Sequence, residues 1–348
     1  MSATRSRLRA VLVASDPRRA AHLAAVLEVD LTIAVVAQVA PASATATIID
    51  VRPGVVVMVS SPDAPGQALV EEIMTLAPTP ILVIADGPDL GHPRAVSNAL
   101  AAGAADAFIV PAQWTPELAL SLRHSAHQLS KVHVVRRARR AAPAGAGAAI
   151  DHRSLALLQN RPPVVALAAS TGGPSALATI LAGLHGLAAP VLVVQHLHPD
   201  FDTGLVEWMS RVSALPVKTA ADGELARPGQ VYVSPGGVHL RLAAHGHLEL
   251  DPQPRSIHRP SADELFASVA ERAGAAGIGV LLTGMGEDGA RGLLSLRTSG
   301  GMTMAQDEET CVVFGMPRAA HRLGAVVKLV PLPQIANAIQ RAVAAVAR

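Results

Sequence analysis

The stretch Val164-Val-Ala-Leu-Ala-Ala-Ser170-Thr-Gly-Gly-Pro174 decides the architecture of the second half of the chain. It begins with an uninterrupted apolar run, which is typical of a strand buried on both faces of a parallel sheet. The two glycines permit a tight turn, and a proline suits the first turn of a helix. We therefore predict a strand, a sharp turn and a helix, with Ser170 at the carboxyl end of the strand.

The alternation of strands and helices continues toward the C-terminus. Further strands of the parallel sheet are expected at 191–194 and 278–282, and hairpin strands at 230–233, 238–242 and 248–250, with 243–247 as the turn. A capping box formed by Ser261 and Glu264 predicts the start of a helix. The second half is thus predicted to be a mainly parallel α/β domain with a β-hairpin.

The first half shows the same rhythm of β-branched runs and Ala-rich helical stretches. Its strands are expected at 8–14, 33–38, 55–59, 81–85 and 107–110. A helix at about 115–131 precedes a stretch of small residues, Pro and Gly, which is typical of a linker. We expect an α/β protein with two doubly wound domains: a flavodoxin-like domain over residues 1–130, a linker over 131–160 and the second domain over 161–348.

Length and composition exclude several classes of protein. The 348 residues suffice for two domains of about 100 to 200 residues each. Hydrophobic residues make up 50% and charged residues 16%, which excludes disorder for most of the chain. The single cysteine, Cys311, can form neither an internal disulfide nor a thiolate metal cage, which fits a reducing compartment.

Charge and hydropathy argue against nucleic-acid and membrane partners. A net charge of +2 with 2% aromatic residues gives no basic, aromatic-rich footprint for nucleic acid. No apolar run approaches the roughly 20 residues of a spanning helix. The start, residues 1–9, is basic without the apolar region of a signal peptide. We expect a cytoplasmic protein with no membrane insertion and no nucleic-acid partner.

Three polar residues stand at or shortly after the carboxyl ends of predicted strands, namely Ser170, His196 and Asp288. Ligands of open α/β sheets bind beyond these ends, and helix N-termini there stabilise developing negative charge. Serine, histidine and aspartate can serve as nucleophile, general base and orienting group. Three such strand ends in one sheet favour a catalytic site over chance.

Each residue also has a simpler interpretation when it is taken alone. Ser170 and Asp288 are suited to cap the helices that follow them. A histidine at a strand end is commonly a hydrogen-bonded structural residue. The sequence Ala168-Ala-Ser-Thr-Gly172 departs from Gly-x-Ser-x-Gly by its first residue. On the residues alone these alternatives stay open.

Two ligand-binding interpretations are disfavoured. His239, His245 and His247 lie on a predicted strand and its turn, with no carboxylate or Cys at ligand spacing, so we expect no metal site. A phosphate-loop function for the Ser-Thr-Gly-Gly turn is disfavoured because neither Gly-x-x-x-x-Gly-Lys-Ser/Thr nor Gly-x-Gly-x-x-Gly is present there. We expect no cofactor.

The second half, from about residue 163 onward, resembles the catalytic domain of the chemotaxis protein-glutamate methylesterases, the CheB family. The motifs that carry the resemblance are Ala169-Ser-Thr-Gly-Gly-Pro174, Val194-Gln-His196, Pro235-Gly-Gly-Val-His239, Arg259-Pro-Ser-Ala-Asp263, Leu282-Thr-Gly-Met-Gly-Glu-Asp-Gly289, Ala305-Gln-Asp-Glu-Glu309 and Phe314-Gly-Met-Pro317. Their order and spacing make the resemblance highly specific. One departure is Ala168, where the family often has Gly.

The resemblance implies a mechanism and a substrate. It implies a catalytic triad of Ser170, His196 and Asp288, with the backbone N–H groups of Thr171 and Met285 as the oxyanion hole. The implied reaction is hydrolysis of glutamate γ-methyl esters on the cytoplasmic helices of methyl-accepting chemoreceptors. Deamidation of receptor glutamines is implied as a second reaction, and other chemosensory proteins as further partners.

The first half resembles a response-regulator receiver domain that has lost its phosphorylation chemistry. Residues unable to do this chemistry occupy the family positions of the phosphoacceptor, the switch hydroxyl and the phosphate-binding lysine, namely Val59, Ala85 and Val110. Only Asp16 remains of the acidic pair, although phosphoryl transfer needs a carboxylate nucleophile and oxygen ligands for Mg²⁺. We predict a pseudo-receiver without a phosphoacceptor, used for docking, autoinhibition or dimerisation. The alternative is a compensating loop carboxylate, Asp63 or Asp86.

A rival function is that of a non-catalytic chemosensory adaptor that binds partners through both α/β domains. The complete set of Ser170, His196 and Asp288 argues against this rival, because a binding module has no use for all three. We therefore expect a serine esterase that acts on methylated receptors.

Overall fold

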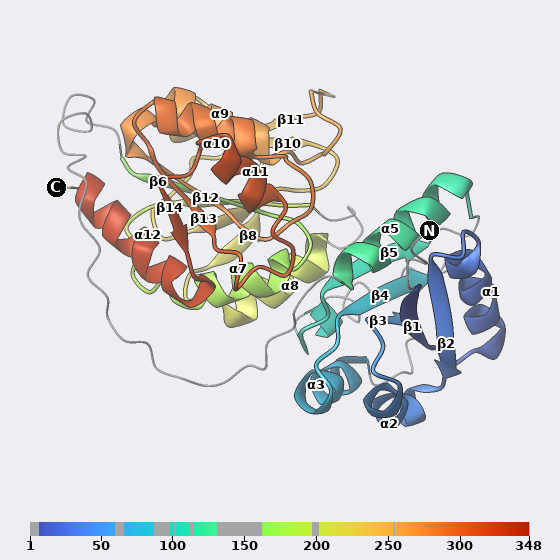
Figure 1. Cartoon of the computed structure of the whole chain (residues 1–348). Coiled ribbons are helices and arrows are strands. Elements are labelled where there is room, and N and C mark those ends of the chain that lie inside the picture. The colour runs from blue at the N-terminus through green and yellow to red at the C-terminus, as the bar shows by residue number, and fades with distance from the viewer. Residues whose placement is uncertain are drawn as a thin grey trace. The chain divides into compact units, whose positions relative to one another are not determined.

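A computed structural model shows the chain as two compact units, Met1–Ala138 and Arg139–Arg348 (Figure 1). The structure describes residues 7–59, 66–86, 98–100, 102–110, 114–130, 162–196, 202–253 and 255–347. The expected linker over 131–160 lies outside these ranges. Within them, every helix is too short or too polar to cross a lipid bilayer.

The N-terminal unit is built on a five-stranded sheet with the order β2-β1-β3-β4-β5. All neighbouring strands run parallel. This strand order is that of flavodoxin-like doubly wound domains, which confirms the predicted fold class for this unit. The elements are β1 (Leu8–Val13), α1 (Pro17–Glu28), β2 (Ile33–Val39), α2 (Pro41–Val51), β3 (Val55–Val59), α3 (Gly66–Leu76), β4 (Ile81–Asp86), β5 (Asp106–Val110) and α5 (Pro116–Leu129).

Local sequence explains the central elements of this unit. Every residue of β3 is buried, as a continuous apolar run requires when helices cover both faces of a sheet. Helix α1 begins after Asp16, whose carboxylate accepts a hydrogen bond of 2.9 Å from Arg18 N, with Pro17 in the first turn. Asp16, the acidic residue that remains of the expected pair, is therefore a helix cap.

The C-terminal unit is built on a seven-stranded sheet with the order β14-β13-β12-β6-β7-β9-β8, and a separate two-stranded hairpin, β10-β11. All neighbouring strands of the large sheet run parallel. Its strands are β6 (Val164–Ala169), β7 (Val191–Gln195), β8 (Val217–Thr219), β9 (Val231–Val233), β12 (Gly277–Leu281), β13 (Met302–Gln306) and β14 (Lys328–Val330). The hairpin and helices are β10 (His239–Leu242), β11 (Leu248–Asp251), α7 (Gly173–Leu181), α8 (Asp202–Val212), α9 (Ala262–Arg272), α10 (Ala290–Thr298), α11 (Met316–Arg322) and α12 (Leu332–Val346).

The position of β9 differs from the expectation that its residues belong with the hairpin. Strand β9 pairs in parallel with β7 and β8, and all of its residues are buried. A run as short as Val-Tyr-Val does not distinguish a hairpin strand from a core strand by periodicity. The hairpin itself forms as predicted, from β10 and β11 in antiparallel register.

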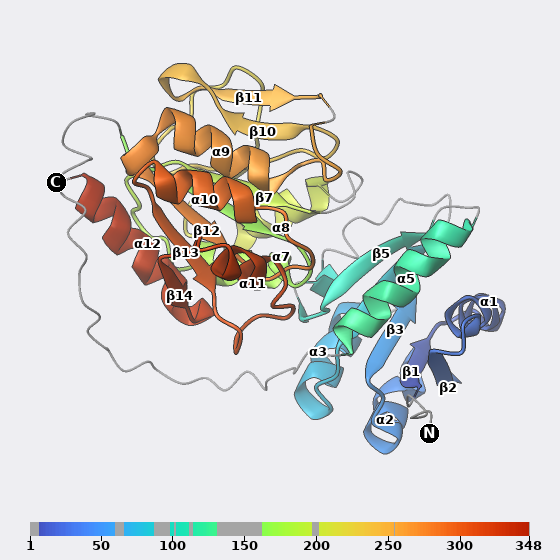
Figure 2. The ribbon, with the colours of Figure 1, turned by 45° about the horizontal axis from the view of Figure 1, so that its top comes forward.

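The sheet order determines where functional side chains meet. Strand β6 lies between β12 and β7, and all three are parallel, so their carboxyl ends meet at one edge. Figure 2 shows α9 and α10 lying together beside this part of the sheet, where they pack against each other. This edge is the expected place for a site in an open α/β sheet.

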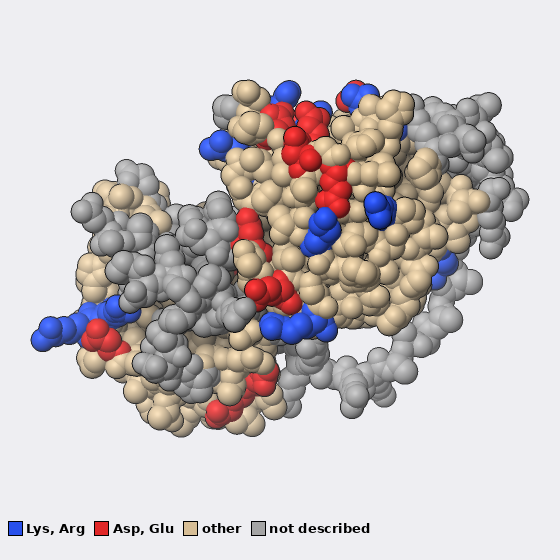
Figure 3. All heavy atoms as spheres, turned by 180° about the vertical axis from the view of Figure 1, so that it is seen from behind, with Lys and Arg blue, Asp and Glu red and all other residues tan. Residues whose placement is uncertain are grey.

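Charged side chains are sparse on the surface, as the composition requires. Figure 3 shows acidic and basic groups in small clusters on an otherwise uncharged face of the C-terminal unit. Among the charged side chains of this unit, Lys218 pairs with Glu224 at 2.6 Å and Arg241 with Glu249 at 3.8 Å. One partner of each pair is exposed and the other partly buried, and ion pairs at a protein surface stabilise a fold by only about 0 to 1 kcal/mol each.

Candidate active site

The three predicted site residues follow three adjacent strands. Ser170 comes directly after β6, His196 directly after β7, and Asp288 lies in the loop between β12 and α10. The register pairs Ala169 of β6 with Gln195 of β7, so the serine and the histidine are the next residues of each strand. The sheet thus brings Ser170 and His196 to one edge.

The turn that carries Ser170 is built by close backbone approach. Ser170 N donates to Thr283 O at 3.0 Å, and Gly173 N donates back to Ser170 O at 2.8 Å. Gly172 occupies the N-cap of α7 with φ 77°, a left-handed conformation that favours glycine. A Cβ at Gly172 would also lie 2.5 Å from Val312 Cβ. The N-cap is Gly172, so the alternative role of Ser170 as a helix cap is wrong.

His196 and Asp288 form a hydrogen-bonded pair. The Nε2 atom of His196 lies 2.8 Å from Oδ2 of Asp288, and their side chains are only 11% and 6% exposed. An ionised carboxylate only accepts hydrogen bonds, so Nε2 carries the proton. The tautomer is thereby fixed, and Nδ1 is the ring nitrogen with a lone pair available to accept a proton.

The N-terminus of α9 holds the Asp288 carboxylate. Oδ1 accepts from Ser261 Oγ at 2.8 Å and from Asp263 N at 3.1 Å, while Oδ2 accepts from Ala262 N at 2.7 Å. Backbone N–H groups at a helix N-terminus favour negative charge. The cap of α10 is Gly289 without any side-chain bond, so Asp288 does not cap that helix.

These contacts set the ionisation of Asp288. Burial raises the pKa of this carboxyl group, but the hydrogen bond and the charge of His196, together with Ala262 N–H and Ser261 O–H, outweigh burial. The pKa of Asp288 is therefore held well below its usual range. The residue is an anion at neutral pH and can stabilise a positive imidazolium.

His258 covers one face of the His196 ring. The two rings are stacked, with centroids 4.5 Å apart and an interplanar angle of 12°. His258 as a whole is exposed, but burial of its ring and the charge of His196 lower its pKa, whereas Asp288 acts in the opposite direction. Among the described residues, no hydrogen bond joins Ser170 Oγ to His196. Such bonds often tighten only when substrate is bound.

The loop after β12 runs directly beside Ser170. A Cβ at Gly284 would lie 2.8 Å from Ser170 Cβ, and Met285 is the next residue along this loop. The fully buried Thr283 donates from Oγ1 to Thr171 O at 2.9 Å. Within the described residues, Met285 N donates to no acceptor. Both predicted oxyanion residues thus flank the serine.

The three histidines at which we expect no metal site differ in their surroundings. His239 is fully buried on β10, whereas His245 lies in the connecting turn and is exposed. In the described part of the chain, no group of three or more His, Cys, Asp or Glu side chains could hold a metal ion.

The N-terminal unit offers different chemistry at its corresponding edge. Val59, which ends β3, is only 6% exposed, and Asp16 caps α1. Asp63 lies outside the described residues, as do the side chains of Asp86 and Val110. The described residues of this edge therefore contain the cap carboxylate of Asp16 and an apolar strand end.

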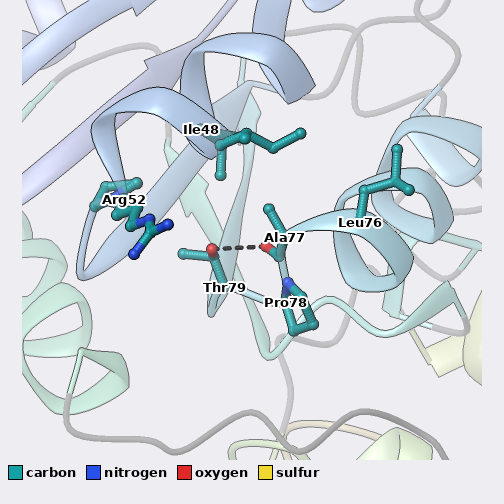
Figure 4. Close-up of a pocket in the computed structure, with 8 residues that line it drawn as sticks. Ile48, Arg52, Leu76, Ala77, Pro78 and Thr79 are labelled. Atoms are coloured by element: carbon teal, nitrogen blue, oxygen red, sulfur yellow. Dashed lines mark hydrogen bonds between the residues drawn. The ribbon is translucent and has the colours of Figure 1, made fainter.

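A hollow of about 340 Å³ lies at the opposite edge of the same sheet (Figure 4). Its lining consists of Ile48, Ile49, Arg52, Pro53, Leu76, Ala77, Pro78 and Thr79. Pro53 precedes β3 and Thr79 precedes β4, so the hollow lies at the amino ends of the strands. Arg52 is the only charged residue in this lining, and the Thr79 hydroxyl donates to Ala77 O at 2.8 Å, so the lining holds no side chain that could act as a general base toward that hydroxyl.

Sequence reasoning missed several contacts of the site. Ser261 was predicted only as a helix cap, although its hydroxyl also reaches Asp288. Gln195, Thr283 and His258 had no assigned role, although all three contact site residues. The only available signal was that Gln195 and Thr283 lie inside motifs that carry site residues.

Comparisons with a family model and with known proteins point to the same family. The model of the CheB methylesterase family matches residues 165–339. The chain is 39% identical over 298 residues to protein-glutamate methylesterase/protein-glutamine glutaminase 1 of Myxococcus xanthus, with 84% of each chain covered. It is 37% identical over 345 residues to the protein-glutamate methylesterase/protein-glutamine glutaminase of Agrobacterium fabrum, with 96% of each covered.

A solved structure resembles the C-terminal unit. The CheB methylesterase catalytic domain of Thermotoga maritima is 38% identical in sequence, with a TM-score of 0.50. The match covers 52% of this chain and 98% of that chain.

Proposed function

The chain belongs to the CheB methylesterase family, and from this premise we propose that Ser170, His196 and Asp288 form its catalytic triad. The enzyme is a protein-glutamate methylesterase, a carboxylic ester hydrolase. The observation that supports the triad most strongly is the 2.8 Å hydrogen bond from His196 to Asp288 beside the strand end that carries Ser170. Residue types and geometry then agree with the three roles of a serine hydrolase.

In the first half-reaction, Ser170 Oγ attacks the γ-carbonyl carbon of a glutamyl methyl ester. His196 accepts the hydroxyl proton at Nδ1, and Asp288 stabilises the imidazolium through Nε2–H. The tetrahedral intermediate then breaks its bond to the methoxy oxygen, which takes the proton from His196 and leaves as methanol. The product is an ester between the glutamyl group and Ser170.

In the second half-reaction, water attacks this ester while His196 accepts a proton from the water. The bond to Ser170 Oγ breaks, the serine regains its proton, and the receptor carries a glutamate. Backbone N–H groups of Thr171 and Met285 stabilise the oxyanion in both steps, since both residues flank the serine. With ammonia as the leaving group, the same steps convert glutamine to glutamate.

The proposed substrate sites are on the cytoplasmic helices of methyl-accepting chemoreceptors. The proposed location of the enzyme is the cytoplasm. Other chemosensory proteins are proposed as further partners. We assign the receiver-type domain to residues 1–130, the linker to 131–160 and the catalytic domain to 161–348. Val59 at the phosphoacceptor position supports a pseudo-receiver that serves docking, autoinhibition or dimerisation.

Methanol release from a carboxyl-methylated receptor tests the proposal. The wild-type chain should release methanol, and Ser170→Ala should lower kcat by about 10⁴-fold or more without unfolding the protein. Ser210→Ala is the matched control, because its hydroxyl donates to Val206 O on α8, away from the site. More than a few per cent of wild-type activity in pure Ser170→Ala would contradict the triad.

A further inference from the structure

Gln195, the last residue of β7, connects the nucleophile and the base. Its side chain is buried, and its Nε2 donates one hydrogen bond to Ser170 O at 2.9 Å and another to His196 O at 3.0 Å. We propose that Gln195 is a positioning residue that holds Ser170 and His196 at the separation needed for proton transfer. The inference rests on the proposed roles of Ser170 and His196.

The carboxamide is needed for this geometry. Two carbonyl oxygens face the same side-chain atom, and only the NH₂ group can donate to both. The other atom, Oε1, is buried with no hydrogen-bond partner among the described residues. A buried polar atom without a partner is uncommon in a native fold, because it loses its hydrogen bonds to water without gaining others. This cost is consistent with a carboxamide kept at this position for its two N–H donors.

The turn after β6 is shaped around this side chain. A Cβ at Gly173 would lie 2.0 Å from Gln195 Oε1 and 2.7 Å from Ala169 Cβ. Any larger residue at Gly173 would therefore displace the carboxamide. The glycine that begins α7 thus makes room for the residue that contacts both catalytic backbones.

The two hydrogen bonds of the Gln195 side chain lie just beyond the last paired residues of β6 and β7. The paired register of β6 and β7 stops at Ala169 and Gln195, and the last backbone bond runs from His196 N to Ala169 O at 3.0 Å. Sheet pairing therefore does not hold the carbonyl groups of Ser170 and His196. The Gln195 side chain joins these two carbonyls, which extends the connection between the strands by one residue.

This position matters because proton transfer depends on small distances. A displacement of about 1 Å between reacting groups can lower a rate by about 10²-fold. Among the described residues, Gln195 is the side chain that donates to the His196 carbonyl. Loss of the carboxamide should therefore change the Ser170–His196 geometry while substrate binding remains.

The experiment compares Gln195→Met with Gln230→Met in the full chain. Gln230 is a matched control, because its Nε2 also donates to two carbonyl oxygens, Pro216 O at 2.9 Å and Val231 O at 3.1 Å. Gln195→Met should lower kcat for methanol release by about 10²-fold with KM unchanged. Gln230→Met should leave both constants unchanged. Values of kcat within twofold of wild type in folded Gln195→Met would overturn the proposal.

A second readout is independent of the receptor. A fluorophosphonate forms an Oγ–P bond with Ser170 while fluoride leaves and His196 takes the proton, so its rate reports the reactivity of the serine without any contribution from the receptor. Gln195→Met should slow this reaction by a similar factor in the wild-type background and by less than twofold in a His196→Ala background. Equal slowing in both backgrounds would show a general structural effect and overturn the proposal.

Two further outcomes distinguish the proposed substrate from the proposed role of Gln195. A wild type that releases no methanol but is phosphonylated at Ser170 would contradict the proposed substrate, and the phosphonylation rates would still decide the role of Gln195. If Gln195→Met does not fold, Gln195→Asn retains the amide but is too short to reach both carbonyls, and should show the same loss of kcat alone. An Asn variant with wild-type kcat would overturn the proposal.

Discussion

At the residue scale, the Asp288 carboxylate is the most heavily contacted group of the site. Its oxygens accept hydrogen bonds from His196 Nε2, Ser261 Oγ, Ala262 N and Asp263 N. Hydrogen bonds to an ionised group are stronger than those between neutral groups. The carboxylate that hydrogen-bonds to His196 is therefore itself fixed by the start of α9.

Replacement of Asp288 by Asn should lower stability in a pH-dependent way. The folded-state pKa of Asp288 lies below the unfolded value of about 3.9, so its stabilising effect is complete above that value and is lost as pH falls through the folded pKa. The difference in unfolding free energy between wild type and variant should be constant near neutral pH and shrink below about pH 4. Urea unfolding across this range measures it, and a difference independent of pH would contradict the ionised pair.

Sequence alone pointed to three candidate residues at strand ends but not to all of their partners. Ser170 directly follows an apolar run, and His196 follows one after a single glutamine, which is a local signal. The sequence around Asp288 allowed a helix cap equally well. The structure instead places Gly289 at that cap, and the carboxylate contacts Ala262, which is 26 residues away along the chain. Contacts between such distant segments leave no periodic pattern in a single sequence.

At the element scale, the first turn of α9 combines helix capping with support of the site. Ser261 accepts a hydrogen bond from Glu264 N at 3.4 Å, as the predicted capping box requires, and donates to Asp288 at 2.8 Å. The same hydroxyl thus stabilises the helix and orients the carboxylate. Helix α9 also packs closely against α10, which follows Asp288.

Ser261→Ala should therefore affect both stability and turnover. Loss of the cap should lower the free energy of unfolding by about 1 kcal/mol. Loss of a donor to an ionised carboxylate should lower kcat by about tenfold, the equivalent of about 1.4 kcal/mol. Thr115→Ala is the matched control, because Thr115 Oγ1 accepts from Leu118 N at 3.2 Å at the start of α5. Equal kcat in Ser261→Ala and wild type would limit Ser261 to a capping role.

The longer elements could be predicted because their patterns are local. The apolar runs of β3 and β6 and the Ser261 cap of α9 are visible in the sequence itself. Strands β8, β9 and β14 contain only three residues each, too few to show alternation. Their places in the sheet depend on packing against neighbouring strands.

At the scale of the whole molecule, two α/β units of similar construction differ in chemistry. The edge of the first sheet ends in the buried Val59, and Asp16 is a helix cap. The corresponding edge of the second sheet brings together a serine, a histidine and a carboxylate. Fold class alone would not distinguish them, because function depends on the residues at the strand ends.

The N-terminal unit should not respond to phosphodonors. Acetyl phosphate with Mg²⁺ should give no stable acyl phosphate on residues 1–130 and no change in the rate of methanol release, because Val59 offers no carboxylate nucleophile. A phosphodonor can shift the equilibrium between two conformations of this unit only if the attached phosphoryl group interacts more favourably with one of them, and no such group is attached here. Incorporated phosphate that survives gel separation and raises activity would show that another carboxylate, Asp63 or Asp86, has taken this role.

The central claim is that Ser170, His196 and Asp288 act as one catalytic unit, and a double-mutant comparison of methanol release tests it most directly. Members of one unit show non-additive losses. If Ser170→Ala alone abolishes the covalent step, adding His196→Ala should cause less than about a twofold further loss in kcat. We predict that the double variant and Ser170→Ala have nearly equal kcat. A double variant whose loss in kcat equals the product of the two single losses would contradict the claim, because each substitution would then act independently.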